Sequence, residues 1–390
     1  MSLILFESNN LEGLRPFSVN HSPVELRIGA FTNLERVQHL YKDEDIILIV
    51  RDSIKNIIEE RFPDLSVNPD NIPKGLCLNS SAIFEDEKLN LVKNNDALSN
   101  CDELISFKLD RVTTLLKFRE YLDKKIDITV SCDIPIIKNI WDIFKYSKRK
   151  LSSDFNEFLF NNNYIYHPSL IMINQEQIYI GPDVEIKAGV IIDASKGPVI
   201  IKKEAIIDHG TVIEGPNYIG DKTYIAPLTK VRPNNIIGPM CKVGGEISDN
   251  NFLGYSNKVH GGFLGHSYVG EWVNIGAGTN NSNLKNNYGL VKVKIENKIY
   301  STDLQFLGSL IGDYTRIAIG TNLNTGTFIG IGANVFNHKL IDNYIASFSW
   351  GKDKKVQLDS FITTLSEMKK RREKNISSSE KEYIKQLYSK

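Results

Sequence analysis

The chain has 390 residues, enough for two domains and a short additional element, and its 41% of hydrophobic residues is typical of a globular protein. Its 47 basic and 47 acidic side chains cancel, so no net charge draws it to nucleic acid or anionic lipid. It has no CxxC pair, no signal-peptide pattern and no apolar run near the roughly 20 residues that span a bilayer. We therefore expect a cytoplasmic protein with neither a nucleic-acid nor a membrane partner.

Short aliphatic strands alternate with helical stretches in the first part of the chain. The strands are expected at Leu3–Phe6, Ile46–Val50 and Leu104–Leu109. This alternation predicts a three-layer α/β domain with a partly parallel sheet over residues 1–140. Residues 141–165 follow as a predicted helical connector.

A six-residue period governs the second half of the chain. Every sixth residue is a branched aliphatic over one long stretch: Ile201, Ile207, Ile213, Ile219, Ile225, Val231, Ile237 and Val243. The spacing resumes further on: Phe263, Val269, Ile275, Ile311, Ile317, Leu323, Ile329, Val335 and Ile341. A period of six fits neither an amphipathic helix nor a half-buried strand. It predicts a left-handed parallel β-helix over residues 166–351, with three flat faces per coil and the aliphatic side chains stacked inside.

The six-residue count breaks twice. It slips between Val243 and Phe263, and an insertion separates Ile275 from Ile311. The first break contains GYSNKVHGGFLGH, residues 254–266, whose glycines are also compatible with a simple loop. Because insertions in a solenoid leave as loops and tend to build the binding face, we expect function near these breaks.

Residues 352–390 form a basic tail with a helical pattern. Its apolar residues recur at helical spacing: Leu358, Phe361, Ile362, Leu365 and Met368. We expect an amphipathic helix whose apolar stripe covers the open end of the solenoid.

Several motifs resemble a known enzyme family. The stretch HGGFLGHSYVGEWVNIGAGTNNSN, residues 260–283, resembles the acetyltransferase segment of the bifunctional N-acetylglucosamine-1-phosphate uridylyltransferase/glucosamine-1-phosphate acetyltransferases. Residues 254–265, 280–288 and 348–351 also resemble a divergent branch of that family, described as sugar nucleotidyltransferases. The resemblance covers essentially the whole chain and is strongest from about residue 165 to 351.

This resemblance implies a transferase of nucleotide-sugar biosynthesis that serves the cell envelope. It implies acetyl-CoA as acyl donor, UTP or another nucleoside triphosphate, a sugar phosphate, and Mg²⁺. It also implies a homotrimer with acyltransferase sites between neighbouring subunits. Two alternatives stay open: a non-catalytic trimeric scaffold or sugar-nucleotide-binding regulator, and a protein that retains only one of the two activities.

For acyl transfer, the resemblance places His260 at the catalytic base and the backbone N–H of Ala277 at the thioester oxygen. A sugar amine that attacks a thioester loses a proton, and an imidazole can accept it at neutral pH. The relatives' tyrosine after the histidine is Phe263 here, so the acceptor sugar stays open. His266 is six residues from His260, so the two are expected on adjacent faces and not as a zinc-chelating pair.

The resemblance also implies substrate contacts on the β-helix. Arg232 matches an arginine that holds the sugar phosphate, and a guanidinium suits that task. Asn274 and Asn283 match asparagines that contact substrate or cofactor. The relatives' second phosphate-binding lysine is missing at residues 248–251, and Lys258 is the nearest replacement in the sequence.

In the N-terminal part, the family's G-x-G-T-R phosphate loop is missing. Arg15 and Arg27 match the divergent branch and are expected either to bind the triphosphate or to form surface ion pairs. Asn79 lies at a predicted strand end that would face such a site. Asp133 is in a position similar to the aspartate that holds Mg²⁺ in the family.

Overall fold

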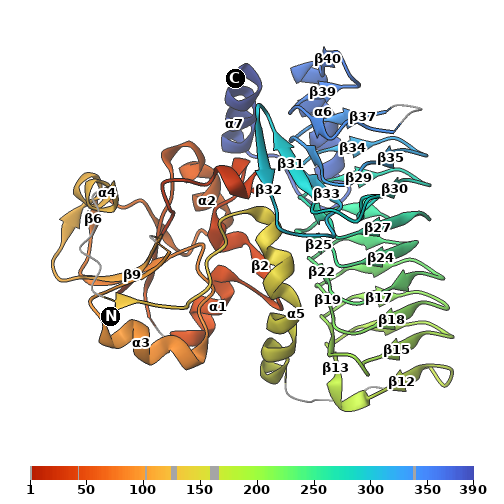
Figure 1. Ribbon diagram of the computed structural model, residues 1–390, viewed down its shortest axis with the longest axis horizontal. Helices are drawn as coiled ribbons and strands as arrows, with labels where there is room; N and C mark the ends of the chain where they lie inside the picture. The colour runs from red at the N-terminus through yellow and green to blue at the C-terminus, as the bar shows by residue number, and fades with distance from the viewer. Residues whose placement is uncertain (1, 43, 102, 124–129, 159–166, 337–339) are drawn as a thin grey trace.

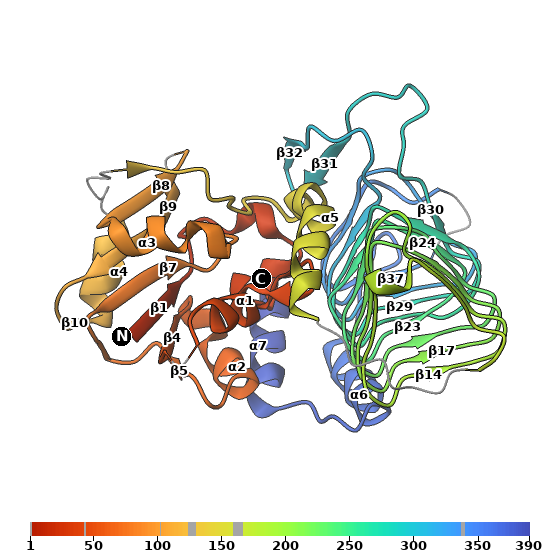
Figure 2. The same ribbon diagram turned by 90° about the horizontal axis from the view of Figure 1, so that it is seen from below.

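The computed structural model describes residues 2–42, 44–101, 103–123, 130–158, 167–336 and 340–390. An α/β domain lies beside a three-sided coil of short strands, and a long helix runs between them (Figures 1 and 2). The C-terminal helices lie beside the last coils and reach back to the N-terminal domain (Figures 1 and 2). No helix among the described residues is long and apolar enough to cross a membrane.

The N-terminal sheet has seven strands in the order β11-β8-β9-β7-β1-β4-β5. Their bounds are β1 Ser2–Phe6, β4 Ile46–Ile49, β5 Ser66–Val67, β7 Gly75–Asn79, β8 Ala97–Asn100, β9 Glu103–Leu109 and β11 Val130–Ser131. Strand β1 pairs in parallel with both β4 and β7, whereas β9 runs antiparallel to its neighbours. Because β1 and β4 are largely aliphatic, both of their faces can be buried between layers. The predicted partly parallel sheet and its three predicted strands are confirmed.

Seven α-helices are found among the described residues: α1 Asn33–Leu40, α2 Lys55–Arg61, α3 Leu89–Asn94, α4 Leu115–Asp123, α5 Ile143–Asp154, α6 Leu358–Lys370 and α7 Ser378–Ser389. Two short ladders complete the N-terminal part, formed by β2 Arg27–Ile28 with β3 Phe31–Thr32, and by β6 Asn71–Ile72 with β10 Thr113–Thr114.

Helix α5 is tied to the N-terminal domain by a buried ion pair. Arg36 donates from Nη1 to Asp154 Oδ1 at 2.7 Å and from Nη2 to Oδ2 at 2.9 Å. Gly29, at φ +78°, lies against the same carboxylate, and a Cβ there would collide with Asp154 Oδ2. Only glycine therefore suits this close approach. The connector predicted at residues 141–165 contains this helix; residues 159–165 lie outside the described part.

The β-helix has three faces. The first face contains β12 Ile171–Ile173, β15 Ile191–Asp193, β18 Val212–Glu214, β21 Lys230–Val231, β24 Glu246–Ser248 and β27 Phe263–Gly265, and the pair β30 Asn280–Asn281 and β35 Asn322–Leu323 follows in the later coils. The second face contains β13 Ile178–Ile180, β16 Val199–Ile201, β19 Asn217–Ile219, β22 Asn235–Ile237, β25 Asn251–Phe252, β28 Tyr268–Val269, β33 Ser309–Ile311, β36 Thr327–Ile329 and β38 Tyr344–Ile345. The third face contains β14 Glu185–Ile186, β17 Ile206–Ile207, β20 Tyr224–Ile225, β23 Lys242–Val243, β26 Asn257–Lys258, β29 Asn274–Ile275, β34 Arg316–Ile317, β37 Asn334–Val335, β39 Ser349–Trp350 and β40 Lys354–Lys355.

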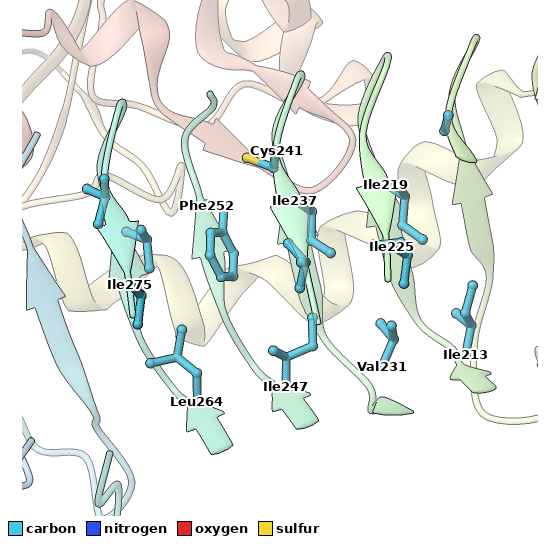
Figure 3. Close-up of a cluster of buried hydrophobic side chains, with 14 of the residues drawn as sticks. Ile213, Ile219, Ile225, Val231, Ile237, Cys241, Ile247, Phe252, Leu264 and Ile275 are labelled. Atoms are coloured by element: carbon cyan, nitrogen blue, oxygen red, sulfur yellow. The ribbon is translucent and has the colours of Figure 1, made fainter. Parts of the chain in front are cut away.

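The aliphatic side chains of the six-residue period fill the interior of the β-helix. All eight from residue 201 to residue 243 are at most 1% exposed, and Figure 3 shows several of them stacked coil upon coil. Parallel ladders bring residues from successive coils into contact, so apolar surface is removed from water along the whole axis. The left-handed parallel β-helix predicted from the period is confirmed.

Coil length explains the slip in the count. Ile213 pairs with Val231, a full three steps of the period further on. Ile237 instead pairs with Phe252, although three full steps would reach Tyr255. The next coil is also short, because Ile247 pairs with Leu264 and not with Gly265. Leu264 therefore points inside and is 1% exposed (Figure 3). The prediction that Phe263 occupies the interior is wrong, because the shortened coils shift the register by one residue.

The insertion between Ile275 and Ile311 forms a hairpin against the N-terminal domain. Its strands are β31 Lys292–Ile295 and β32 Lys298–Ser301. Buried side chains of β31, including Val293, pack with Leu14 of the N-terminal segment and with Trp141, which lies directly before α5. The insertion therefore joins the two domains. The sequence predicted a binding loop here and gave no sign of this contact.

The predicted tail helix is α6. Its buried Phe361 and Leu365 pack on corner residues of the last coils, Trp272, Tyr314 and Phe348. The apolar stripe therefore covers the side of these coils. Helix α7 follows and contacts both α6 and α2 of the N-terminal domain.

A buried cluster of charges lies between the two domains. His21 contacts Asp313 of the β-helix through Nε2 at 2.8 Å and Glu25 through Nδ1 at 3.1 Å. Arg61 donates to Glu25 Oε1 at 2.8 Å, and Asn20 donates to Asp313 Oδ2 at 3.0 Å. Burial by itself would lower the pKa of His21, but Asp313 and Glu25 outweigh it and raise this pKa to about 9. His21 is therefore a cation at neutral pH.

Candidate functional site

The turns between the third and first faces bring His260 and Ala277 onto adjacent coils. We call residues 260–262 and 277–278 the histidine corner. The Gly278 N–H donates to the Gly261 carbonyl at 2.9 Å, which joins the two turns. Gly262 has φ +119°, and a Cβ there would collide with the backbone of the next coil. The close approach of two turns thus requires a glycine after His260.

The groups at the histidine corner are accessible. His260 is exposed, and Ala277 is partly exposed. In the described part of the chain, no acceptor hydrogen-bonds the Ala277 N–H. An imidazole and a backbone donor on neighbouring coils are the two groups that acyl transfer to an amine needs, one for the proton and one for the developing oxyanion.

Asn274 lies next to this corner on the third face. Its side chain is exposed and its strand neighbours are Asn257 and Arg316. Asn257 Oδ1 accepts from Arg372 of the tail at 2.8 Å. The tail therefore approaches the strip of polar side chains that leads to the histidine corner.

Arg232 lies on the first face, two coils before β27. Its side chain is 54% exposed, and Nη1 donates to Glu246 Oε1 at 3.0 Å. On β27 itself, the N–H of Phe263 donates to Asn280 Oδ1 at 2.8 Å, directly after the glycines of the corner. Arg232 and the histidine corner thus border the same face.

Asn283 does not join the histidine corner. It lies across the first face, where its Nδ2 donates to His266 Nδ1 at 3.0 Å. His266 Nε2 is 3.8 Å from Asp249 Oδ2, and the ring stacks on Phe306 with centroids 5.3 Å apart. Burial lowers the pKa of His266, so the ring is neutral. No sequence signal pointed to Asp249 or Phe306, because both contacts depend on how coils and insertion fold together.

Lys258 is buried inside the solenoid. It is 1% exposed, and its Nζ donates to the carbonyls of His260 at 3.0 Å and Gly244 at 3.2 Å. The expectation that Lys258 replaces a phosphate-binding lysine is corrected, because its ammonium faces the interior and not the substrate side. Burial lowers the pKa of this lysine to about 8.

A cavity of about 570 Å³ opens at the carboxyl ends of β1 and β4. In open α/β sheets this edge is the usual ligand site, where neighbouring strands lead to opposite sides. Its charged lining includes residues from both ends of the chain: Glu7, Glu12, Arg15, Arg51, Asp52, Arg119, Asp123 and Lys390. Helix α7 supplies one wall through Tyr383 and Leu387.

The arginines that line this cavity differ in how strongly other protein groups already hold them. Arg51 donates to Glu7 Oε1 at 2.8 Å and to the His21 carbonyl, while Arg119 holds Asp52 with two hydrogen bonds. Arg15 is 38% exposed, and its ion-pair partner among the described residues is the exposed Glu296 of the hairpin, at 2.6 Å. Arg15 is therefore the guanidinium that an entering anion can recruit most easily.

Arg27 lies outside this cavity. It is 8% exposed, its Nη1 donates to the Ala30 carbonyl and lies 2.9 Å from Glu35 Oε2, and its guanidinium lies 5.0 Å from the ring centre of Tyr218 on the β-helix. Both expected roles, triphosphate binding and a surface ion pair, are therefore corrected. Arg27 is buried at the junction of the domains.

Asn79 and Asp133 do not line the cavity either. Asn79 is 1% exposed, and its amide ties the end of β7 to Ser8 and to the Leu104 carbonyl. Asp133 is exposed and pairs with Lys88 at 2.7 Å, away from the cavity lining. Among the described residues, no group of three or more His, Cys, Asp or Glu side chains is arranged to hold a metal ion. The site expected for Mg²⁺ at Asp133 is not supported by this geometry.

Comparison with known proteins finds similarity to sugar nucleotidyltransferases and to bifunctional relatives. Residues 3–160 match the family described as sugar nucleotidyl transferase. A bifunctional sugar-1-phosphate nucleotidylyltransferase/acetyltransferase from Sulfurisphaera tokodaii is 36% identical over 143 residues, which cover 36% of each chain. A protein named bifunctional protein GlmU from Thermodesulfovibrio yellowstonii is 30% identical, and the match covers 46% of this chain and 38% of the relative. Another protein of that name, from Clostridium novyi, is 23% identical, and the match covers 74% of this chain and 62% of the relative.

Over parts of its length, this chain is similar to bifunctional sugar nucleotidyltransferases/acetyltransferases. The resemblance inferred from the sequence motifs is thereby confirmed. The matches span only 36%, 38% and 62% of the lengths of these relatives. Among solved structures, a UDP-N-acetylglucosamine acyltransferase from Campylobacter jejuni matches 43% of this chain and 69% of its own, with 14% identity and a TM-score of 0.24, too low to support any inference.

Proposed function

We propose that this protein is a two-domain transferase of nucleotide-sugar biosynthesis. The β-helix would transfer an acyl group from acetyl-CoA to an amino-sugar phosphate, and the N-terminal domain would join a sugar 1-phosphate to a nucleotide from UTP or another triphosphate. The observation that carries the proposal is the histidine corner, where an exposed imidazole and an available backbone N–H lie on adjacent coils of the described chain. The reactions would take place in the cytoplasm and supply cell-envelope synthesis.

In acyl transfer, the sugar amine attacks the thioester carbon and the C–S bond breaks. His260 accepts the proton that the amine loses, and the Ala277 N–H donates to the oxygen that becomes negative in the transition state. Arg232, on the adjoining face, is the candidate to bind the sugar phosphate, and Asn274 borders the corner on the other side. Asn283, with His266, would contact the far end of a ligand that crosses the first face.

In nucleotidyl transfer, a sugar-phosphate oxygen attacks the α-phosphorus and pyrophosphate leaves. The cavity at the ends of β1 and β4 is large enough for a nucleotide, and Arg15 would bind its phosphates. The cavity's carboxylates Glu7 and Asp52 are held by arginines. These two carboxylates are therefore not free to form a cation site in this arrangement.

Replacement of Arg15 by Ala is expected to weaken nucleotide binding by about 1.5–3 kcal/mol, the usual size for a charge-assisted hydrogen bond. The fold should be unaffected, because the pair with Glu296 is exposed. Isothermal titration calorimetry with UTP measures this loss. Arg111→Ala, at an exposed position outside the cavity, is the matched control and should bind like the wild type.

We also propose a homotrimer of parallel β-helices with the histidine corner facing a neighbouring subunit. Leu228 and Ile319 lie at the same edge, on coils before and after His260, and each is 78% exposed. Exposed apolar residues on both sides of a polar site suit a subunit contact. Light scattering at micromolar concentration is expected to give three times the chain mass, and a monomer would contradict the assembly.

In a second candidate function, the protein has acyltransferase activity only, and the N-terminal domain binds a ligand without catalysing a reaction. It is favoured by the missing G-x-G-T-R loop and by the cavity carboxylates, which repel phosphate. Thioester consumption and pyrophosphate release, measured separately with a panel of amino-sugar and sugar phosphates, distinguish the candidates. Absence of both activities, together with tight sugar-nucleotide binding, would favour the scaffold or regulator.

A further inference from the structure

Lys258 occupies a position that the fold reserves for aliphatic side chains. It pairs with Val243 of the preceding coil, and the pairing of Asn257 with Asn274 sets it beside Ile275 of the following coil. Val243 and Ile275 are buried members of the aliphatic column, and Lys258 is 1% exposed. An ammonium thus interrupts an otherwise apolar stack.

The ammonium of Lys258 is surrounded by carbonyl oxygens. Its Nζ donates to His260 O at 3.0 Å and to Gly244 O at 3.2 Å. In the described part of the chain, no carboxylate forms an ion pair with it. Burying an unpaired ammonium is unfavourable, and a methionine of similar length would fill the same space without that cost. Packing alone therefore does not account for a lysine here.

The two carbonyls belong to turns that are rich in glycine. The turn after His260 continues with Gly261 and Gly262, and a Cβ at Gly261 would meet nothing within 4 Å. The turn on the preceding coil contains Gly244 and Gly245. At these glycine positions, neither turn has a side chain that could hold it in place by packing. Because glycine has high conformational freedom, hydrogen bonds must fix the orientation of these turns. Lys258 supplies two of these bonds from inside the coil.

We propose that Lys258 is a positioning residue whose buried ammonium joins the Gly244 and His260 turns and fixes the orientation of the His260 imidazole. Its catalytic consequence rests on the proposed acyltransferase function. The ammonium does not touch substrate. It acts by keeping His260 in the geometry in which the imidazole can reach the amine, since small displacements of a catalytic group reduce the rate strongly.

The test compares Lys258→Met, which has no donor, with Lys258→Gln, whose shorter side chain keeps an uncharged amide donor. Lys258→Met is expected to lower kcat for acyl transfer roughly 10- to 100-fold, the usual effect of removing a group that orients a catalytic residue, while KM changes less than about twofold. Lys258→Gln should recover part of the loss. Lys242→Met is the matched control, because Lys242 is an exposed lysine on the preceding coil of the same face.

Hydrogen–deuterium exchange gives a readout that needs no activity. Peptides covering residues 254–266 should exchange about tenfold faster in Lys258→Met than in the wild type, whereas peptides from the first coils should be unchanged. The melting temperature should stay within about 4 °C, because the loss of two hydrogen bonds is offset by removal of a buried charge. If Lys258→Met fails to fold, kcat and hydrogen–deuterium exchange are both measured on Lys258→Gln instead.

The outcomes separate this inference from the proposed function. Wild-type exchange and full kcat in Lys258→Met would overturn the role of Lys258, even if His260→Ala abolishes activity. A wild type without acyltransferase activity would contradict the proposed function, and accelerated exchange in Lys258→Met would then still support the role of Lys258 in holding the turn. A uniform acceleration of exchange over all coils would indicate a general loss of stability and overturn the inference.

Discussion

His260→Ala is expected to lower acyl transfer by roughly 10²–10⁴-fold, the range for loss of a general base. The imidazole is exposed at the histidine corner, and the described residues offer its ring no hydrogen-bond partner. Its removal should therefore change the melting temperature very little. Initial rates of thiol release from acetyl-CoA, measured with amino-sugar phosphates, give the effect directly.

His209→Ala is the matched control for this experiment. His209 lies at the same edge of the solenoid on an earlier coil and is exposed, and its ring contacts the adjacent Asp208. It should keep wild-type turnover. A His260→Ala protein with full activity would show that the histidine is structural, and that the glycine-rich break merely lets the chain turn.

Asp313→Ala is expected to destabilise the protein by about 3–5 kcal/mol, as does removal of one partner of other buried ion pairs. Asp313 is 1% exposed, accepts from His21 and Asn20 of the N-terminal domain, and also accepts the N–H of Glu271. Its loss leaves the cation of His21 buried beside Arg61 without this carboxylate. Urea unfolding followed by tryptophan fluorescence measures the change, and the exposed Asp110→Ala should leave stability within about 0.5 kcal/mol.

The same cluster should make stability depend on alkaline pH. The pKa of His21 is raised to about 9 in the fold, compared with about 6.5 in an unfolded chain. The stabilisation is thus fully present below pH 6.5 and is lost as pH rises through 9, up to about 3 kcal/mol. Urea unfolding of the wild type from about pH 6 to 10 should show this fall. Asp313→Asn should flatten it, and an equal slope in both proteins would contradict the assignment.

The architecture of both domains could be predicted from local sequence patterns. The six-residue period forces a three-sided coil because each aliphatic residue from Ile201 to Val243 must face inward, and the structure buries all eight. The aliphatic segments that form β1 and β4 likewise predicted a partly parallel sheet. Local patterns suffice here, since the burial of each residue depends on its own strand and face.

The environment of the charged residues, in contrast, follows from the tertiary structure. Lys258 faces inward because the coil that leads from Val243 to it is three residues shorter than three full steps of the period. Arg27 is buried because its strand β2 meets the β-helix at Tyr218. The hairpin at residues 292–301 and helix α7 likewise reach the N-terminal domain through contacts between distant parts of the chain. A long polar side chain has no periodic signal, so its partners depend on which segments the whole fold brings within hydrogen-bonding distance.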